Sequence, residues 1–234
     1  MSIRLVLFDI DGTLIVSGRA GLRGMNRAFL QIYGRPNALE GVPIAGRTDR
    51  AIVTEVLREL GRDPDEAEIA RVRDAYIDCL REEIAVPVAL PSQVLPGVGD
   101  LLDALDARRV PVGLLTGNFA GGAAVKLSHF SLWTRFGFGA YGDDHVDRRA
   151  LVPIALAQAV ANGVTVPASE IAIIGDTPLD VDCALAHGAH AIGVTTGPFD
   201  AASLSAAGAD LVVDSLADTS RVMEWLAQPR RARG

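Results

Sequence analysis

IRLVLFDIDGT, residues 3–13, is the stretch that decides the fold class of this chain. Residues 3–8 form a nearly continuous apolar run, which is typical of a strand buried on both faces of a parallel sheet. Asp9 breaks the apolar run, so the segment predicts a strand and not a secretory signal peptide. In open α/β sheets, ligands bind outside the carboxyl ends of the strands. The stretch therefore predicts a central strand that places Asp9 and Asp11 where a ligand binds.

Similar apolar segments recur along the rest of the chain, and helical patterns separate them. We expect further strands at residues 110–115, 138–141, 171–174, 190–194 and 211–213. We expect helices at residues 98–109, 121–130, 153–162, 178–187 and 201–207. Strands that alternate with helices predict an α/β fold, with a Rossmann-like parallel sheet covered by helices on both faces.

A long stretch without a strand pattern, residues 16–92, separates the first strand from the second. Apolar residues recur in it at helical spacing and indicate three amphipathic helices. We expect Asp63 to be the N-cap of the third helix and Pro64 its first residue. The chain is therefore predicted to have a Rossmann-like catalytic core and an inserted all-helical cap domain, with the core at 1–15 and 93–234 and the cap at 16–92.

Composition narrows the classes of function. Of the 234 residues, 49% are hydrophobic and 22% are charged, which is ordinary for a globular protein. A formal net charge of −7 argues against nucleic acid or an anionic membrane as a partner. No segment reaches the ~20 apolar residues of a membrane span. Cys79 and Cys183 show neither a disulfide framework nor a metal-ligand spacing, so we expect free thiols and a cytoplasmic location.

Three aspartates follow predicted strands and are expected to meet at one edge of the sheet. Asp9 and Asp11 follow the first strand, and Asp176 follows the strand at 171–174. Carboxylates this close repel one another unless they share a cation. Because carboxylate oxygens and water suit Mg²⁺, we expect Asp9, Asp11 and Asp176 to bind this ion. Asp180 is expected in the first turn of the next helix, where an acidic side chain suits the helix dipole.

Neutral hydrogen-bond donors follow the strand at 110–115. Thr116 offers a hydroxyl, Gly117 a backbone N–H and Asn118 an amide, directly before a predicted helix. Such donors suit phosphate oxygens, although the same tripeptide would serve equally as a helix-entry turn.

Three motifs together resemble those of the haloacid dehalogenase superfamily: FDIDGTL at 8–14, LLTGN at 114–118 and IIGDTPLD at 173–180. The resemblance covers essentially the whole chain, including the order of the motifs and a helical cap inserted after the first one. Within the superfamily, the chain is similar to the branch of phosphoglycolate phosphatases and β-phosphoglucomutases. Asp11 favours phosphoryl transfer over halogen removal, because halogen-removing members characteristically lack this second aspartate.

The resemblance implies a Mg²⁺-dependent phosphatase that hydrolyses a small-molecule phosphate monoester. Asp9 would attack phosphorus and form an aspartyl-phosphate, and Asp11 would act as general acid and base. Thr116 would hold the transferring phosphoryl group, and Gly117 and Asn118 would bind the substrate nearby. A nucleophilic carboxylate and a phosphate dianion repel each other, so a cation must offset that repulsion.

The sequence departs from the superfamily at the basic residue of the third motif, since the usual Lys-Pro pair is absent. Asp147, Arg148 and Arg149 stand in its place. The competing residue is Lys126, the one lysine among 22 basic residues. We expect Arg148 to matter more for turnover than Lys126, because its loop should abut the strand ends, while Arg149 stays open as an alternative.

Arg47 is the candidate for substrate selection in the cap. It precedes the second cap helix, and the resemblance implies that this region faces the active site. An arginine there would contact a carboxylate or a second phosphate of the substrate, while an ordinary loop at a helix start is an equal alternative. A sugar phosphomutase of the same superfamily is the alternative enzyme, and a non-catalytic phosphate-sensing protein is a more distant one.

Overall fold

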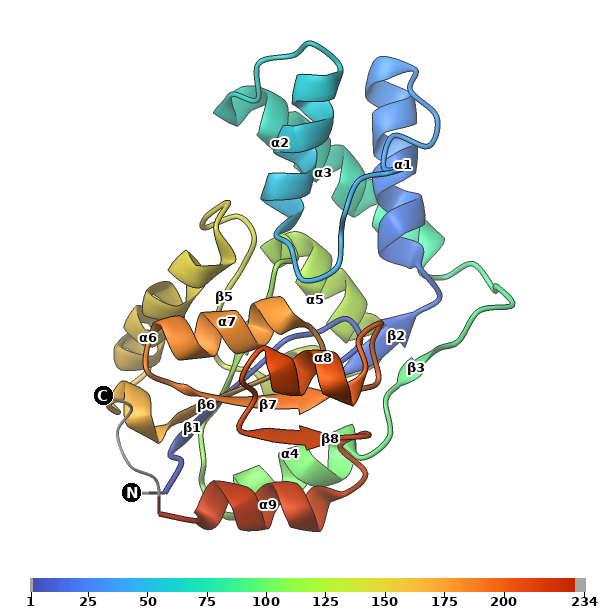
Figure 1. Ribbon diagram of the computed structural model, residues 1–234. Coiled ribbons are helices and arrows are strands. Elements are labelled where there is room, and N and C mark those ends of the chain that lie inside the picture. Colours follow the sequence, from blue (N-terminus) through green and yellow to red (C-terminus); the bar gives the residue numbers. More distant parts are fainter. Residues whose placement is uncertain (1, 230–234) are drawn as a thin grey trace.

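The computed structural model describes residues 2–229, and its core is a six-stranded sheet in which every neighbouring pair is parallel (Figure 1). The strand order is β5-β4-β1-β6-β7-β8. The strands are β1 Leu5–Phe8, β4 Val112–Leu115, β5 Gly139–Ala140, β6 Ile171–Gly175, β7 His190–Val194 and β8 Leu211–Val213.

Strand β1 occupies the centre of the sheet because all four of its side chains are buried. Val6 is paired with Val112 of β4 on one side and with Ala172 of β6 on the other. The chain leaves β1 toward one edge of the sheet and later returns to build the other edge, so the strand order reverses at β1. Ligands in such sheets bind where the order reverses, at the carboxyl ends of the strands.

Helices cover both faces of the sheet, which confirms the predicted fold class. Alternate residues of β1 serve the two faces: Val6 and Phe8 join one hydrophobic cluster, and Leu5 and Leu7 join the other. The first face carries α4 Val98–Ala107, α5 Ala120–His129 and α9 Thr219–Ala227. The second face carries α6 Leu151–Ala161, α7 Pro178–Ala186 and α8 Ala201–Ala206.

The three helices between β1 and β4 pack around a hydrophobic cluster of their own, above the sheet in Figure 1. They are α1 Ala20–Tyr33, α2 Asp49–Glu59 and α3 Glu66–Glu83. The prediction that Asp63 caps α3 is wrong, since Asp65 is the N-cap and its side chain accepts from the N–H of Glu68. An N-cap needs an extended backbone and a free N–H two or three residues ahead, and Asp65 has both.

A small second sheet, which the sequence analysis did not predict, joins the two ends of this helical segment. Strand β2, Ile15–Ser17, pairs antiparallel with β3, Ser92–Val94. Three-residue strands are too short to leave a periodic pattern, so only their pairing identifies them. The pairing brings the two chain crossings between sheet and helices side by side.

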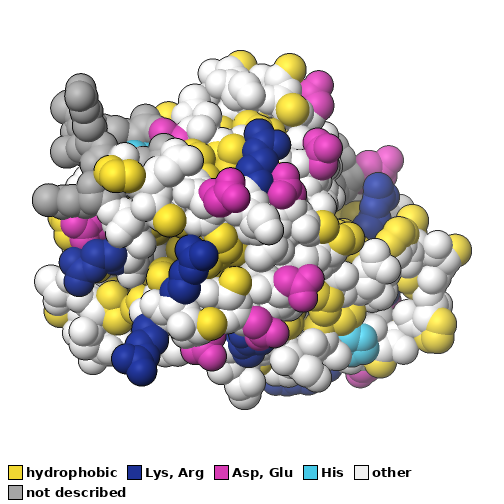
Figure 2. All heavy atoms as spheres, turned by 90° about the horizontal axis from the view of Figure 1, so that it is seen from below, with side chains coloured by type: hydrophobic (Ala, Val, Ile, Leu, Met, Phe, Trp, Pro, Cys, Tyr) yellow, Lys and Arg dark blue, Asp and Glu magenta, His cyan; other side chains and the backbone are white. Residues whose placement is uncertain are grey.

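Among residues 2–229, no helix combines the length and the apolarity needed to cross a bilayer. The face seen from below in Figure 2 intersperses basic and acidic side chains with apolar ones. Cys79 and Cys183 are free and buried, as the sequence predicted.

Two glycines at the start of α4 provide a matched test of the packing. Gly97 has a φ of 81°, and a Cβ there would lie 2.1 Å from the backbone of Leu216. Gly97→Ala should therefore lower the free energy of unfolding by more than about 2 kcal/mol. Gly99, inside the helix, has no such neighbour within 4 Å, so Gly99→Ala should raise the free energy by about 0.5–1 kcal/mol. Urea unfolding measures both, and equal effects of the two substitutions would contradict this packing.

Candidate active site

The three motifs meet at the carboxyl ends of three adjacent strands. Asp9 directly follows β1, Thr116 directly follows β4 and Asp176 directly follows β6. Because β1 lies between β4 and β6, the three side chains reach the same edge of the sheet. All three are buried, with exposed fractions of 6%, 0% and 2%.

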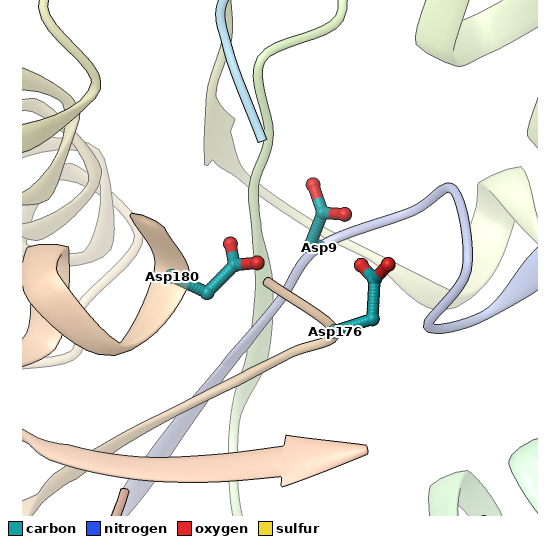
Figure 3. Close-up of side chains that lie close together, drawn as sticks. All are labelled: Asp9, Asp176 and Asp180. Carbon is teal, nitrogen blue, oxygen red and sulfur yellow. The ribbon is translucent and has the colours of Figure 1, made fainter. Parts of the chain in front are cut away.

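Asp9, Asp176 and Asp180 form a compact group of carboxylates. Each offers an oxygen within 4.8 Å of the others, and Figure 3 shows the three side chains facing a common space. Asp180 stands in the first turn of α7, where it forms a capping box with Thr177, as expected of its position. Its membership of this carboxylate group was not predicted, because a capping role already explained an acidic residue there.

The carboxylates are held in an environment that disfavours their charge. Burial raises the pKa of Asp9 to about 6; the Arg148 guanidinium opposes this rise, while Asp180 adds to it. Burial, together with the charges of Asp9 and Asp180, raises the pKa of Asp176 to about 9, although the Arg148 guanidinium opposes the rise. The group therefore holds more negative charge than the protein itself neutralises.

Arg148 is the cation beside Asp9. Its guanidinium is buried and donates to Asp9 Oδ1 at 2.8 Å and to Asp180 Oδ1 at 2.5 Å. Arg149 points elsewhere, since its guanidinium pairs with Asp182 at 2.6 Å on the surface. Of the two neighbouring arginines, only Arg148 reaches the carboxylate group.

Lys126 is the cation beside Asp11. Its buried Nζ lies 2.6 Å from Asp11 Oδ2 and 2.6 Å from Asn118 Oδ1. Asn118 Nδ2 donates to the same Asp11 oxygen at 2.9 Å and to Thr116 Oγ1 at 2.8 Å. Asp11 thus lies outside the compact carboxylate group, and its side chain is held from α5 instead.

The segment 46–49, just before α2, lies against the core at the same place. The Gly46 carbonyl accepts from Arg148 at 3.0 Å, and Thr48 Oγ1 donates to the Val146 carbonyl at 2.9 Å. Asp49 donates its N–H to the Gly117 carbonyl at 2.7 Å and accepts from the Phe119 N–H at 2.8 Å. Backbone and side-chain hydrogen bonds of this segment thereby fix the helical part to the strand ends.

Asp49 is a site residue that sequence reasoning missed. An acidic residue in the first turn of a helix is explained by the helix dipole, so nothing in the local sequence singled it out. Burial raises the pKa of Asp49 to about 6, with Lys126 and the Phe119 N–H opposing the rise. It adds a further carboxylate to the site from the side of the helices.

Arg47 lines the site, but its guanidinium already has acidic and backbone partners. It pairs with Glu55 of α2 at 2.6 Å and donates to the Pro43 carbonyl at 2.9 Å. The predicted contact of Arg47 with an anionic group of the substrate stays a prediction.

A cavity of about 570 Å³ joins these groups. On the sheet side it is lined by Asp9, Asp11, Asn118, Lys126, Arg148 and Asp176. On the other side it is lined by residues of α1, α2, α3 and the loops between them. Its size is ordinary for the binding of a small molecule.

The carboxylate group fits a divalent cation. The structure pairs Asp9 and Asp180 with Arg148, whereas Asp176 accepts from the hydroxyl of Thr13 at 3.3 Å and is in no ion pair among residues 2–229. Glycines at 12 and 197 let the backbone approach the Asp176 carboxylate, since a Cβ at either would lie within 2.5 Å of it. Buried carboxylate oxygens short of positive charge are the donors that Mg²⁺ prefers.

Sequence comparison identifies relatives along most of the chain. The sequence model of the haloacid dehalogenase-like hydrolases matches residues 3–188. A phosphoglycolate phosphatase of Pseudomonas putida is 28% identical over 91% of this chain and 77% of its own length. A phosphoglycolate phosphatase of Chromobacterium violaceum is 29% identical over 95% of this chain and 97% of its own length.

Solved structures show the same fold at lower identity. CbbY from Rhodobacter sphaeroides, in complex with phosphate, superposes with a TM-score of 0.71 at 19% identity, over 92% of this chain and 96% of that one. A β-phosphoglucomutase from Clostridium difficile gives a TM-score of 0.71 at 18% identity, over 96% of this chain and 97% of that one.

A divalent cation bound at the carboxylate group should stabilise the folded protein. Mg²⁺ at a hundred times its dissociation constant adds about 2.7 kcal/mol, which appears as a rise in melting temperature. Native Asp176 keeps its proton up to a pKa of about 9, whereas an exposed aspartate loses it near 3.9. The metal-free protein therefore loses stability as the pH rises, and the gain from Mg²⁺ should be larger at pH 8 than at pH 6.

The matched variants separate this site from other acidic residues. Asp176→Asn should lose most of the Mg²⁺-dependent rise, while Asp182→Asn, at the surface pair with Arg149, should keep it. An equal rise in both variants would place the ion elsewhere.

Proposed function

The chain belongs to the haloacid dehalogenase-like hydrolase family, and on that premise we propose that it is a Mg²⁺-dependent phosphatase that hydrolyses small-molecule phosphate monoesters through an aspartyl-phosphate on Asp9. The observation that carries this proposal is the pairing of two carboxylates with two separate cations at the strand ends. Relatives that are phosphoglycolate phosphatases support the reaction class.

In the proposed first step, a carboxylate oxygen of Asp9 attacks phosphorus and the bond from phosphorus to the ester oxygen breaks. Arg148 lies 2.8 Å from the Asp9 carboxylate and can orient both this carboxylate and the incoming phosphoryl oxygens. Thr116, buried at the end of β4, offers its hydroxyl to the same group. Asp9 and Asp176, with Asp11 as the predicted third, would hold Mg²⁺, which supplies positive charge against the repulsion between carboxylate and phosphate.

Asp11 is the proposed acid and base. It gives a proton to the departing alkoxide and then takes a proton from the water that hydrolyses the aspartyl-phosphate. Lys126 and Asn118 both bind Oδ2 of Asp11, which fixes the orientation of the carboxyl group and leaves Oδ1 for proton transfer.

The two cations therefore have different roles in this proposal. Arg148 serves the nucleophile and the transferring phosphoryl group, and Lys126 serves the acid and base. This division favours Arg148 as the basic residue of the third motif.

We favour hydrolysis over a phosphomutase reaction because of the charges on the helical side of the cavity. A mutase must bind a second phosphate, which requires free cations on the helical side. Arg47 pairs with Glu55, and Arg50 is bound to Glu66 and to the carbonyl of Asp143. These pairs offset the charge of the two arginines at the start of α2, which are the ones placed to bind a second phosphate.

We further propose that residues 16–92 act as a cap over the core. Its segment 46–49 closes one side of the cavity through hydrogen bonds to the core, which keeps water from the reacting groups. The cytoplasm remains the predicted location.

Asp9→Asn tests the nucleophile. The amide keeps the shape of the side chain but cannot form the covalent intermediate, so turnover of any phosphate ester should fall to background. Asp11→Asn should retain the first covalent step in part and lose about 10²–10⁴-fold in steady-state rate. Trapping of ³²P on the protein distinguishes the two, with label expected on Asp11→Asn and absent from Asp9→Asn. Steady-state turnover retained by Asp9→Asn would refute the proposed nucleophile.

The different roles of Lys126 and Arg148 can be tested with two esters whose leaving groups differ in basicity. Lys126→Ala should slow an alkyl phosphate about 10²-fold more than p-nitrophenyl phosphate, because only the alkoxide needs a proton from Asp11. Arg148→Ala should slow both esters by the same factor, because both transfer the same phosphoryl group. Arg149→Ala is the neighbouring control and should affect neither. Equal losses on both esters in Lys126→Ala would show that Lys126 acts on the phosphoryl group.

A further inference from the structure

The half of the cavity that would receive the leaving group is walled mainly by apolar side chains. These side chains come from α1, from the loop before α2, from α2 and from α3: Leu22, Met25, Leu39, Ile44, Ile52 and Tyr76. Met25, Leu39, Ile52 and Tyr76 also pack in the hydrophobic cluster of the three helices and are at most 7% exposed, so each contributes only part of its surface to this apolar wall of the cavity.

The cations that line the cavity are mostly neutralised by partners in the protein. Lys126 is bound to Asp11, Arg148 to Asp9 and Arg47 to Glu55. Arg19 lines the rim with an exposed side chain, where water screens its charge.

An anionic leaving group meets a carboxylate on this side of the cavity. Asp49 lines the wall, and its backbone and side-chain bonds to Gly117 and Phe119 prevent it from turning away. A substrate carboxylate would therefore be repelled by Asp49, while the buried cations of the described lining, Lys126 and Arg148, are each bound to a carboxylate.

The cavity is also large for a minimal substrate. Its volume of about 570 Å³ lies within the range of sites that enclose drug-sized ligands. Glycolate, the leaving group of phosphoglycolate, has a carboxylate and a single methylene, so it would leave most of the apolar wall uncovered.

We propose that the substrate of this enzyme is a phosphate monoester whose leaving alcohol carries an extended, uncharged apolar group, recognised by the wall of the cap. This inference rests on the proposed phosphatase activity and adds the class of leaving group. Recognition comes from the burial of apolar surface in a cavity that the bonds of segment 46–49 hold in place.

The direct test is a series of straight-chain alkyl phosphates from methyl to hexyl. Their alcohols have nearly equal basicity, so differences in kcat/KM report binding of the alkyl chain and not the ease of its departure. Each added methylene should raise kcat/KM by about 4-fold. The kcat/KM for hexyl phosphate should also be higher than the kcat/KM for 2-phosphoglycolate. A flat series, or a preference for 2-phosphoglycolate over hexyl phosphate, would overturn the inference.

Two exposed residues of the cap give a matched pair of variants, because neither side chain is buried in the fold. Ile44 lines the cavity and is 39% exposed, and Leu30 of α1 is 48% exposed and lies outside the lining. Ile44→Gln should reduce the gain per methylene, and Leu30→Gln should keep the wild-type gain. If the gain in kcat/KM per methylene were the same in both variants, the apolar wall would not take part in substrate recognition.

Alkyl phosphonates separate a failure of this inference from a failure of the proposed function. Their carbon–phosphorus bond survives the proposed chemistry, so calorimetry measures binding alone. Hexylphosphonate should bind more tightly than methylphosphonate by the same factor of about 4 per methylene. If no ester, including p-nitrophenyl phosphate, is turned over, the phosphatase proposal fails, and the phosphonate series still decides whether the cavity selects apolar groups.

Discussion

Arg148 has to satisfy two buried carboxylates at once, and the rest of the site is arranged around that constraint. Its guanidinium reaches Asp9 at 2.8 Å and Asp180 at 2.5 Å, while Asp176 stands in the same group without an ion pair in the described part of the chain. Removing a carboxylate from water costs several kcal/mol unless charge or hydrogen bonds replace the lost hydration. One arginine among three carboxylates leaves negative charge uncompensated. A divalent cation would offset that charge and so allow a phosphoryl group to bind.

The same arginine ties the helical segment to the core. Its second nitrogen donates to the Gly46 carbonyl, and Asp49 extends the contact to the loop after β4. Groups that would bind the phosphoryl moiety and groups that wall the leaving-group side are therefore joined by a few hydrogen bonds. Chemistry and selection of the leaving group depend on different surfaces of one cavity, so relatives that share the strand-end residues can differ in their walls.

The single lysine illustrates why residue type matters at a buried site. Nζ is a compact charge that fits between Asp11 and Asn118, and Gly21 leaves room for it, since a Cβ there would lie 3.1 Å from Nζ. An arginine presents a broad planar fork that this space does not match. Arg148 uses the several donors of its guanidinium, since one terminal nitrogen donates to both Asp9 and Asp180 and the other donates to the Gly46 carbonyl.

The sequence by itself determined the parallel sheet, the helices on its faces and the arrival of Asp9, Thr116 and Asp176 at one edge, because apolar periodicity and strand-end position are local properties of the chain. It also located Arg148 and Lys126 as the competing cations. Only the tertiary structure decided which carboxylate each one contacts, since Arg148 and Asp9 are 139 residues apart and Lys126 and Asp11 are 115 apart. The two short strands β2 and β3, the place of Asp49 and the apolar wall were likewise settled by contacts between distant segments, which no local pattern records.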